Sequence, residues 1–334
     1  MNRNIYTDLA VELHEIVCKQ KEQVKEEYEI EGVALSVAKY SEEIKITTVD
    51  VIDEKGQKEI GKPIGKYITI ESRSLKENDV ENHEKVIKVI ASNLPKLYNV
   101  NKDTKVLIVG LGNASVTPDA LGPKVVDKVL VTRHIPEEYL PQKFEDSSHS
   151  LCCVSAVSPS VMGRTGIETA EIIKGIVERT KPDLVIAIDA LASRATSRIN
   201  STIQMSNTGV SPGTGMGNKR MQLNKSTLGV PVLAIGVPTV VDAATLINDS
   251  LSAMIEDLVD LSPQDSDFYR MLNQMGIENR YPLIKELLGE NTNMFVTPKE
   301  VDSVVERLSN VIANGINIAL HQGITIEDIN RYIY

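Results

Sequence analysis

The sequence predicts an α/β protein with a parallel or mixed sheet covered by helices, a small N-terminal β-rich addition and C-terminal helices. Four short aliphatic runs, at residues 105–113, 151–157, 184–189 and 230–237, are typical of parallel strands buried on both faces. Helical patterns between the runs indicate βαβ units. The 334 residues are 42% hydrophobic and 25% charged, a globular balance that excludes disordered and fibrous classes.

The region before these runs has a different spacing of hydrophobic residues. Residues 8–28 carry aliphatic side chains at helical spacing, which predicts an amphipathic helix. Period-two alternation then predicts strands of a small sheet at residues 33–37, 44–51 and 67–71, joined by turns such as the one at residues 54–56. A helix is expected next, over residues 77–98.

Within the α/β region, helices are expected at residues 120–131, 166–179 and 240–261. Residues 193–229 form the longest irregular segment, and four glycines in nine residues near its centre exclude a helix or a central strand there. Residues 300–321 form the clearest helix of the remaining chain.

These elements fit one domain in three parts. An N-terminal sheet insertion spans about residues 30–72, the α/β core spans about residues 100–262, and a helical C-terminal part spans about residues 263–334.

Charge and cysteine content narrow the class of protein. With 46 acidic and 36 basic residues, the net charge of −10 lacks the positive footprint of a nucleic-acid-binding protein. Cys18, Cys152 and Cys153 make no disulfide framework, which indicates a reducing cytoplasm. No apolar run reaches the roughly 18 residues of a membrane span, so we expect no membrane partner and no signal peptide.

Polar residues at the carboxyl ends of the predicted strands are the first candidates for chemistry, because open α/β sheets bind ligands there. Asp119 follows the first aliphatic run and Asp189 ends the third. Two converging carboxylates can divide the work of hydrolysis, one as a protonated acid and the other as a base toward water. A carboxylate after five apolar residues, as at Asp189, is costly without a role. Thr117-Pro118-Asp119 is equally typical of a helix start.

Weaker candidates for positioning a substrate follow the same strands or lie in the glycine-rich segment. They are Asn113, Thr239, Asp242, Gly213 and Gly215. The glycines would let the backbone approach an extended peptide closely. Asp242 is equally typical of a first helical turn, and Asn113 of a loop.

Other chemistries lack their sequence signatures. Gly110-Leu111-Gly112 has no third glycine for a dinucleotide fingerprint, and no phosphate-loop motif occurs. The five histidines are scattered without an HExxH motif, and no GxSxG elbow is present. Cys152 and Cys153 are typical of buried core thiols. We therefore expect neither a metal nor a cofactor.

Several segments closely resemble the germination protease family of spore-forming bacteria. They are residues 7–12 (TDLAVE), 107–123 (LIVGLGNASVTPDALGP), 187–192 (AIDALA), 207–220 (NTGVSPGTGMGNKR) and 236–243 (GVPTVVDA). The resemblance implies a three-layer α/β/α phosphorylase/hydrolase-like core, similar to that of hydrogenase maturation proteases. It also implies an atypical aspartic-type endopeptidase whose two essential aspartates match Asp119 and Asp189.

The resemblance further implies an inactive precursor that loses a short propeptide, a homotetramer, and the degradation of small acid-soluble spore proteins in the forespore and spore core. The family cleaves after an acidic residue that precedes a hydrophobic residue and often Ala. Thr7-Asp8-Leu9-Ala10 has this pattern. We therefore expect self-cleavage between Asp8 and Leu9, which divides the chain into a propeptide, residues 1–8, and a peptidase domain, residues 9–334.

Two alternatives remain open. The first is a metal-dependent maturation-type peptidase on the same fold, since hydrogenase maturation relatives use nickel and carry a D-D-G element. Here that element is replaced by Asp119-Ala120-Leu121-Gly122. The second is a non-catalytic protein whose glycine-rich loop binds an acidic peptide or a nucleotide.

Overall fold

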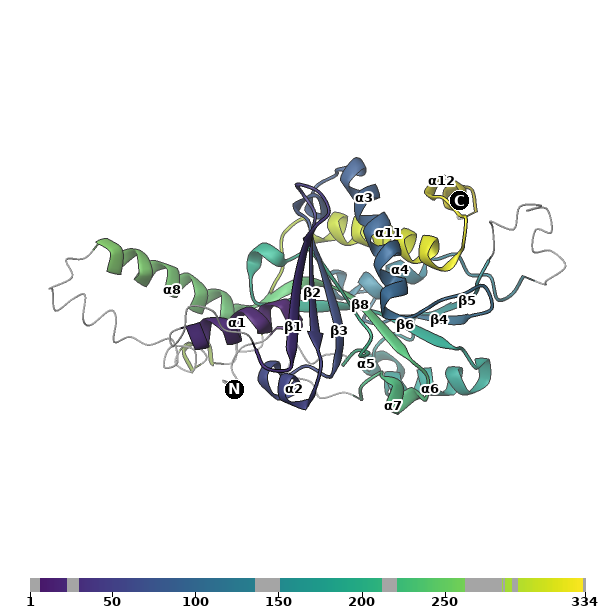
Figure 1. Cartoon of the computed structure of the whole chain (residues 1–334), viewed down its shortest axis with the longest axis horizontal. Helices are drawn as coiled ribbons and strands as arrows, with labels where there is room; N and C mark the ends of the chain where they lie inside the picture. The colour runs from purple at the N-terminus through teal and green to yellow at the C-terminus, as the bar shows by residue number, and fades with distance from the viewer. Residues whose placement is uncertain are drawn as a thin grey trace.

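The protein has a mixed α/β fold built around one sheet. The computed structural model describes residues 7–22, 30–135, 151–211, 221–261, 284, 286–289 and 294–332. These residues form a nine-stranded sheet in the order β1-β2-β3-β7-β8-β6-β4-β5, with β9 paired to β8. Figure 1 shows the strands in the middle of the molecule with helices on both sides. The predicted α/β class is confirmed.

One half of the sheet is parallel. Its strands are β4 (Lys105–Gly110), β5 (Cys153–Val157), β6 (Leu184–Ser193) and β8 (Val232–Asp242). These strands are the four predicted aliphatic runs. β6 and β8 continue beyond the predicted ends at Asp189 and Val237, so their last residues extend past the edge formed by β4.

The other half is antiparallel. Its strands are β1 (Val33–Lys39), β2 (Lys45–Val51), β3 (Gly65–Glu71) and β7 (Thr202–Ser206). The three N-terminal strands were expected to form a small sheet of their own. Instead, β7 pairs with both β3 and β8 and joins the two halves into one sheet. β7 lies inside the segment predicted to be irregular, residues 193–229.

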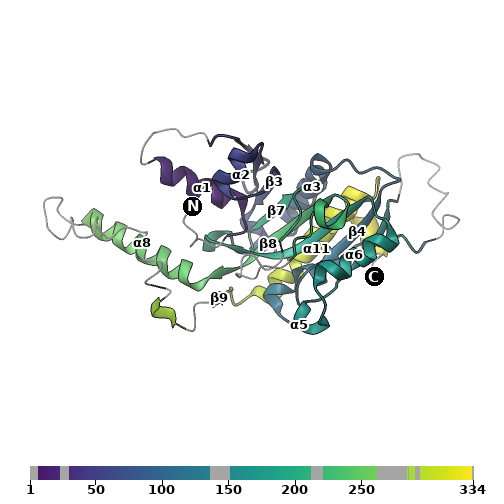
Figure 2. The same cartoon turned by 90° about the horizontal axis from the view of Figure 1, so that it is seen from below.

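Helices cover both faces of the sheet (Figures 1 and 2). The first face is covered by α3 (Val80–Leu97), α4 (Leu121–Val126) and α11 (Val301–Leu320). On the second face, the parallel half is covered by α6 (Thr169–Thr180) and α7 (Lys225–Leu228). The antiparallel half of that face is covered by α1 (Ala10–Glu22) and α2 (Glu54–Ile60).

Some helices differ from the prediction. A turn was expected at residues 54–56, but Asp53 accepts hydrogen bonds from the amides of Lys55 and Gly56 and starts α2 there. α4 is shorter than the predicted 120–131. Further described elements are α5 (Met162–Thr165), α8 (Ala243–Leu261), β9 (Phe295–Val296) and α12 (Ile326–Tyr332). In the described ranges, no helix has the length and apolar character that crossing a bilayer requires.

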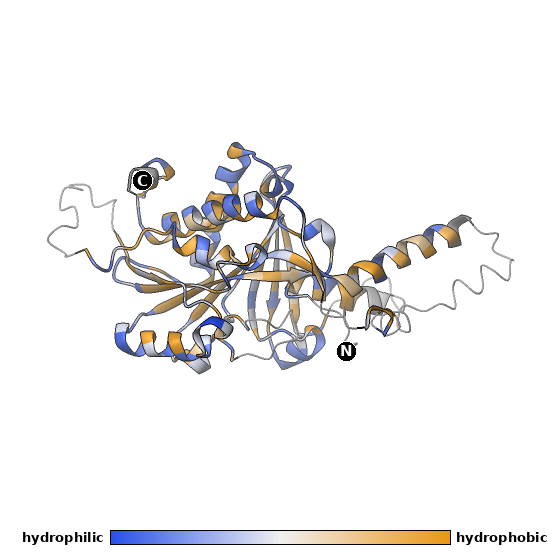
Figure 3. Ribbon diagram, turned by 180° about the vertical axis from the view of Figure 1, so that it is seen from behind, coloured by the Kyte–Doolittle hydropathy of each residue, from blue (hydrophilic) through white to orange (hydrophobic). Residues whose placement is uncertain are grey.

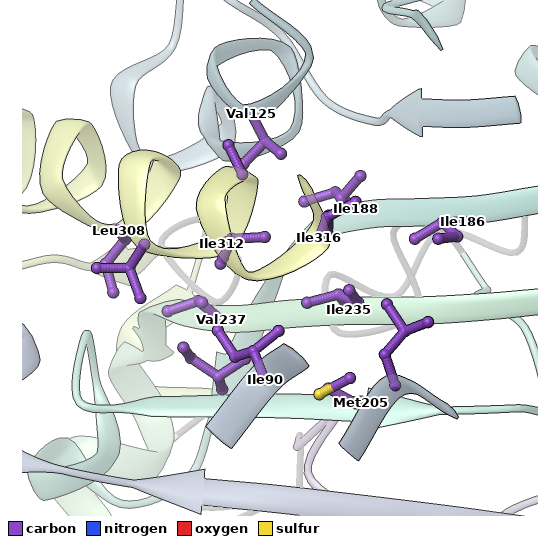
Figure 4. Packing of buried hydrophobic residues seen from close by; sticks show 14 of the residues in the cluster. Ile90, Val125, Ile186, Ile188, Met205, Ile235, Val237, Leu308, Ile312 and Ile316 are labelled. Carbon is purple, nitrogen blue, oxygen red and sulfur yellow. The ribbon is translucent and has the colours of Figure 1, made fainter. Parts of the chain in front are cut away.

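The larger core lies between the sheet and the pair α3 and α11. Figure 4 shows Ile188 of β6 beside Ile316 of α11, and Ile235 of β8 in the same cluster. Hydrophobic colour dominates the strands of the parallel half in Figure 3. Alternate residues of the same strand point to opposite faces, so Ala187 packs toward α6 in the second core. Asp189 has the same parity as Ala187 and therefore points to the second face.

Candidate active site

A cleft of about 830 Å³ opens on the second face, where the covering passes from α6 and α7 to α1 and α2. Its floor is a row of residues in register across three strands: Asp189 of β6, Gly236 of β8 and Gln204 of β7. Their strand neighbours, such as Ile188 and Ile235, are buried in the opposite core. The period of two therefore turns all three residues of the row toward the cleft.

Asp119 enters the same cleft from the 3₁₀ turn η2 (Thr117–Asp119), which follows β4. Its Oδ2 accepts a hydrogen bond from the Asn113 amide at 2.7 Å, and Thr239 Oγ1 donates to the Pro118 carbonyl at 2.7 Å. Gly112 has φ of +106°, and a Cβ there would lie 2.0 Å from the Asp119 carbonyl oxygen. Only glycine allows this turn to pack so closely on the end of β4.

The two predicted aspartates thus line one cleft from different strands. Asp189 is 8% exposed, whereas Asp119 is half-buried. Carboxylates in unequal environments are suited to hold different protonation states, because burial disfavours the charged form. In the part of the chain that the structure describes, no three His, Cys, Asp or Glu side chains are grouped to hold a metal ion.

Three of the weaker candidates for positioning a substrate, Asn113, Asp242 and Thr239, form hydrogen bonds that hold a turn or a helix start. Asn113 Oδ1 accepts from the Ser115 amide at 3.0 Å, which is a turn within the loop after β4. Asp242 is buried, and its Oδ2 accepts from the amide and hydroxyl of Thr245 at 2.9 and 2.8 Å. Asp242 therefore caps the start of α8. Thr239 lines the cleft while its hydroxyl holds the η2 turn.

The glycine-rich segment borders the cleft through Gly209, Val210 and Ser211. Gly213 and Gly215 lie outside the described residues.

The N-terminal segment also lines this cleft. The Asp8 amide donates to the Ala192 carbonyl at 2.9 Å, and the Ala192 amide donates to Asp8 Oδ2 at 2.9 Å. Leu9 and Ala10 are fully buried. The peptide bond between Asp8 and Leu9, the predicted cleavage point, is therefore held beside the extended end of β6.

Two side chains bind the carbonyl group of that bond, one from β7 and the other from the loop between α2 and β3. Lys62 Nζ donates to the Asp8 carbonyl oxygen at 2.9 Å, and Gln204 Nε2 donates to it at 3.1 Å. Gln204 Oε1 accepts from the Ala10 amide at 2.7 Å. Burial lowers the pKa of the Lys62 ammonium, and the negative charge of Asp8 opposes that shift.

Glu12 anchors the segment further along α1. Its buried carboxylate accepts hydrogen bonds from the amides of Arg194 and Ala195 at 2.7 and 2.9 Å and from the Thr7 hydroxyl. Arg198 lies 3.6 Å from the same carboxylate. These contacts fix α1 to the loop that follows β6, and so hold the chain that enters the cleft.

The sequence profile of the germination protease family matches residues 10–265 and 255–333. The chain belongs to this family. It is 49% identical over 332 residues to a germination protease of Caldanaerobacter subterraneus subsp. tengcongensis, covering 99% of this chain and 98% of the relative. It is 46% identical to one of Clostridium perfringens over 99% of both chains. The germination protease of Bacillus subtilis is 43% identical over 98% of this chain and 96% of the relative.

Membership in the germination protease family classes the protein as a protease, and hence a hydrolase, of spore germination. Sequence reasoning did not single out Lys62, Gln204 or Ala192 in this family member. The sequence does carry a pattern that could have found Gln204. Ile203 and Met205 alternate with polar residues, which is typical of a half-buried strand whose polar residues face outward. Lys62 lies between α2 and β3 and has no comparable signal.

Proposed function

We propose that this protein is a spore endopeptidase that is made as a precursor and cleaves itself between Asp8 and Leu9. It then acts as a homotetramer on small acid-soluble spore proteins in the spore core. The proposal includes the phosphorylase/hydrolase-like core that the resemblance implies. Its main support is that Asp8 lines the same cleft as Asp119 and Asp189. The residue before the bond expected to be cut thus borders the cleft that the two carboxylates line.

The proposed reaction is hydrolysis by a water activated between the two carboxylates. Asp119 takes a proton from the water as the oxygen attacks the carbonyl carbon of Asp8. Asp189, the more buried of the pair, holds a proton and donates it to the nitrogen of Leu9 as the peptide bond breaks. The products are a chain that ends in the α-carboxyl group of Asp8 and a chain that begins with the α-amino group of Leu9.

The contacts of the N-terminal segment support a preference for the sequence acid–hydrophobic–Ala. The Ala192 amide bonds the Asp8 carboxylate, which is what an acidic residue before the scissile bond needs. The Leu9 side chain is fully removed from water, which favours an apolar residue after the bond. Ala10 is also fully buried, in the core beneath α1, where a larger side chain would meet its neighbours.

Mass spectrometry of the full chain tests this function. We expect the wild type to gain a species that starts at Leu9 and to cut a small acid-soluble spore protein after acidic residues. Asp119→Asn and Asp189→Asn should each slow both cleavages by at least about 1,000-fold, because each removes an acid–base group. Thermal melting of the variants should show that they remain folded.

Two further arms separate the alternatives. Activity that survives a chelator contradicts the metal-dependent peptidase, and turnover of substrate contradicts the non-catalytic binding protein. A folded Asp119→Asn or Asp189→Asn variant that cleaves at the wild-type rate would refute the proposed pair of aspartates.

A further inference from the structure

We propose that Lys62 Nζ and Gln204 Nε2 form the oxyanion site of this enzyme, where they stabilise the negative charge that develops on the carbonyl oxygen before the scissile bond. This inference rests on the proposed function, because it assigns both residues a role in cleavage of the bond between Asp8 and Leu9. It adds two catalytic residues, Gln204 on β7 and Lys62 in the loop between α2 and β3.

The first argument is convergence on one oxygen. The two donors reach the Asp8 carbonyl oxygen at 2.9 and 3.1 Å, from segments that are far apart in the chain. An oxyanion site needs donors about 2.7–3.1 Å from the position that the charged oxygen takes up, and two donors that already contact the carbonyl oxygen are within reach of that position. Both donors belong to side chains that line the cleft of Asp119 and Asp189. The two donors and the two carboxylates therefore border one cleft.

The second argument is that the Gln204 side chain forms hydrogen bonds with the backbone on both sides of the bond between Asp8 and Leu9. Its Nε2 bonds the carbonyl of Asp8 while its Oε1 accepts from the amide of Ala10 at 2.7 Å. The primary amide thus makes the donor–acceptor pair that a neighbouring β-strand would offer to an extended peptide. The Gln204 backbone is fixed by pairing with Thr69 on one side and Gly236 on the other. The scissile bond is therefore held against a rigid strand.

The third argument is the charge of Lys62. An ammonium in a site partly removed from water stabilises a nearby anion more strongly than the same group in bulk water. Lys62 is half-buried, and Asp8 is the acidic group whose charge supports its protonated form. The remaining titratable groups that line this cleft in the described residues are Asp119, Asp189 and Tyr67. Burial raises the pKa of Tyr67 to about 12, so its phenol stays neutral.

The electron balance of the step is simple. As the water oxygen adds to the carbonyl carbon of Asp8, the π pair of the carbonyl group moves to its oxygen, where the two N–H donors meet it. The pair returns to re-form the C=O bond when the bond to the Leu9 nitrogen breaks. The protons move through the aspartates, so Lys62 and Gln204 neither gain nor lose one.

The test follows self-cleavage of the full chain at fixed pH by the mass of the species that starts at Leu9. Lys62→Met removes the charged donor. Gln204→Glu is nearly isosteric, keeps an acceptor for the Ala10 amide and removes the donor to Asp8. We expect each to slow cleavage about 100-fold or more, the usual loss for one oxyanion donor. Lys76→Met is the matched control, because Lys76 Nζ donates to the Ser197 carbonyl at 3.0 Å outside the cleft.

Cleavage of a small acid-soluble spore protein in trans separates catalysis from anchoring. Loss of an oxyanion donor should lower kcat and leave KM nearly unchanged, because the donor acts on charge that develops in the transition state. A residue that only anchors the peptide would instead raise KM and leave kcat near the wild-type value. Lys62→Arg keeps a charged donor and should retain most of kcat, which also tests the site if Lys62→Met fails to fold.

The outcomes distinguish this inference from the function beneath it. If the wild type cleaves and folded Lys62→Met and Gln204→Glu variants stay within about threefold of Lys76→Met, the oxyanion site is refuted and the protease remains. The oxyanion site is also refuted if folded Lys62→Met and Gln204→Glu variants raise KM while kcat stays at the wild-type value. If the wild type never yields a chain that starts at Leu9, the proposed function is refuted, and so is the oxyanion site that rests on it.

Discussion

The two halves of the sheet contribute different kinds of group to the cleft. The parallel half supplies the carboxylates of Asp119, in the turn after β4, and of Asp189, inside β6. The antiparallel half supplies the hydrogen-bond donors of Gln204 and the adjoining Lys62, which hold the backbone of the N-terminal segment. Asp189 and Gln204 lie in one register row across β6, β8 and β7, so the sheet fixes the positions of both. Asp119 and Lys62 instead come from turns and loops beside the sheet.

The largest expected effect lies in the parallel half, at the turn that carries Asp119. Gly112→Ala should lower the free energy of unfolding by about 3 kcal/mol or more, since it combines a strained positive φ with a Cβ 2.0 Å from a carbonyl oxygen. Self-cleavage should fall as well, because the turn must move. Urea denaturation and the Leu9-starting mass measure the two effects.

Gly229→Ala is the matched control for that change. Gly229 also has positive φ, +77°, but a Cβ there has no atom within 4 Å. It should cost only about 1 kcal/mol. Equal losses in the two variants would contradict the close packing of the Asp119 turn.

The next effect concerns the opposite end of the parallel strands. His321 is fully buried; its Nδ1 accepts from the Cys152 amide at 3.2 Å, and its Nε2 contacts the Leu130 carbonyl at 3.3 Å. Burial lowers the pKa of His321 from 6.5 to about 4. The unfolded chain therefore binds a proton first, and stability that is present above pH 6.5 is lost as the pH falls through about 4.

The full loss from this one group is about 3 kcal/mol. Urea denaturation between pH 7 and pH 4 should show the decline, and His321→Gln should flatten it in that window. An unchanged slope in the variant would assign acid unfolding to other groups. The result also separates loss of folding at low pH from titration of the cleft carboxylates.

The smallest effect probes the point where the two halves meet. Asp8→Asn removes the negative charge that the Ala192 amide bonds and that faces Lys62. A charge-assisted hydrogen bond of this kind is worth about 1.5–3 kcal/mol, so self-cleavage should slow roughly 10- to 100-fold. Asp8→Glu keeps the charge and should lose far less. Equal self-cleavage rates for Asp8→Asn and Asp8→Glu would show that the charge at this position does not contribute to cleavage.

Much of the parallel half could be predicted from residue patterns. The aliphatic runs gave β4, β5, β6 and β8, because a strand buried on both faces leaves a continuous apolar signature. The helices α3, α6, α8 and α11 followed from their spacing, and their ends differ from the prediction by a few residues. β7 was missed, because the glycine-rich stretch that follows it made the whole segment look irregular.

The sequence by itself determined the fold class and singled out Asp119 and Asp189, since aliphatic runs indicate buried strands and the two aspartates are polar residues that follow or end such a run. Only the tertiary structure brought the Asp8 carbonyl within reach of Lys62, 54 residues away, and of Gln204, 196 residues away. Those contacts depend on β7 joining the two halves of the sheet. Register between distant strands is a property of the packed sheet, and no local pattern in either strand specifies its partner.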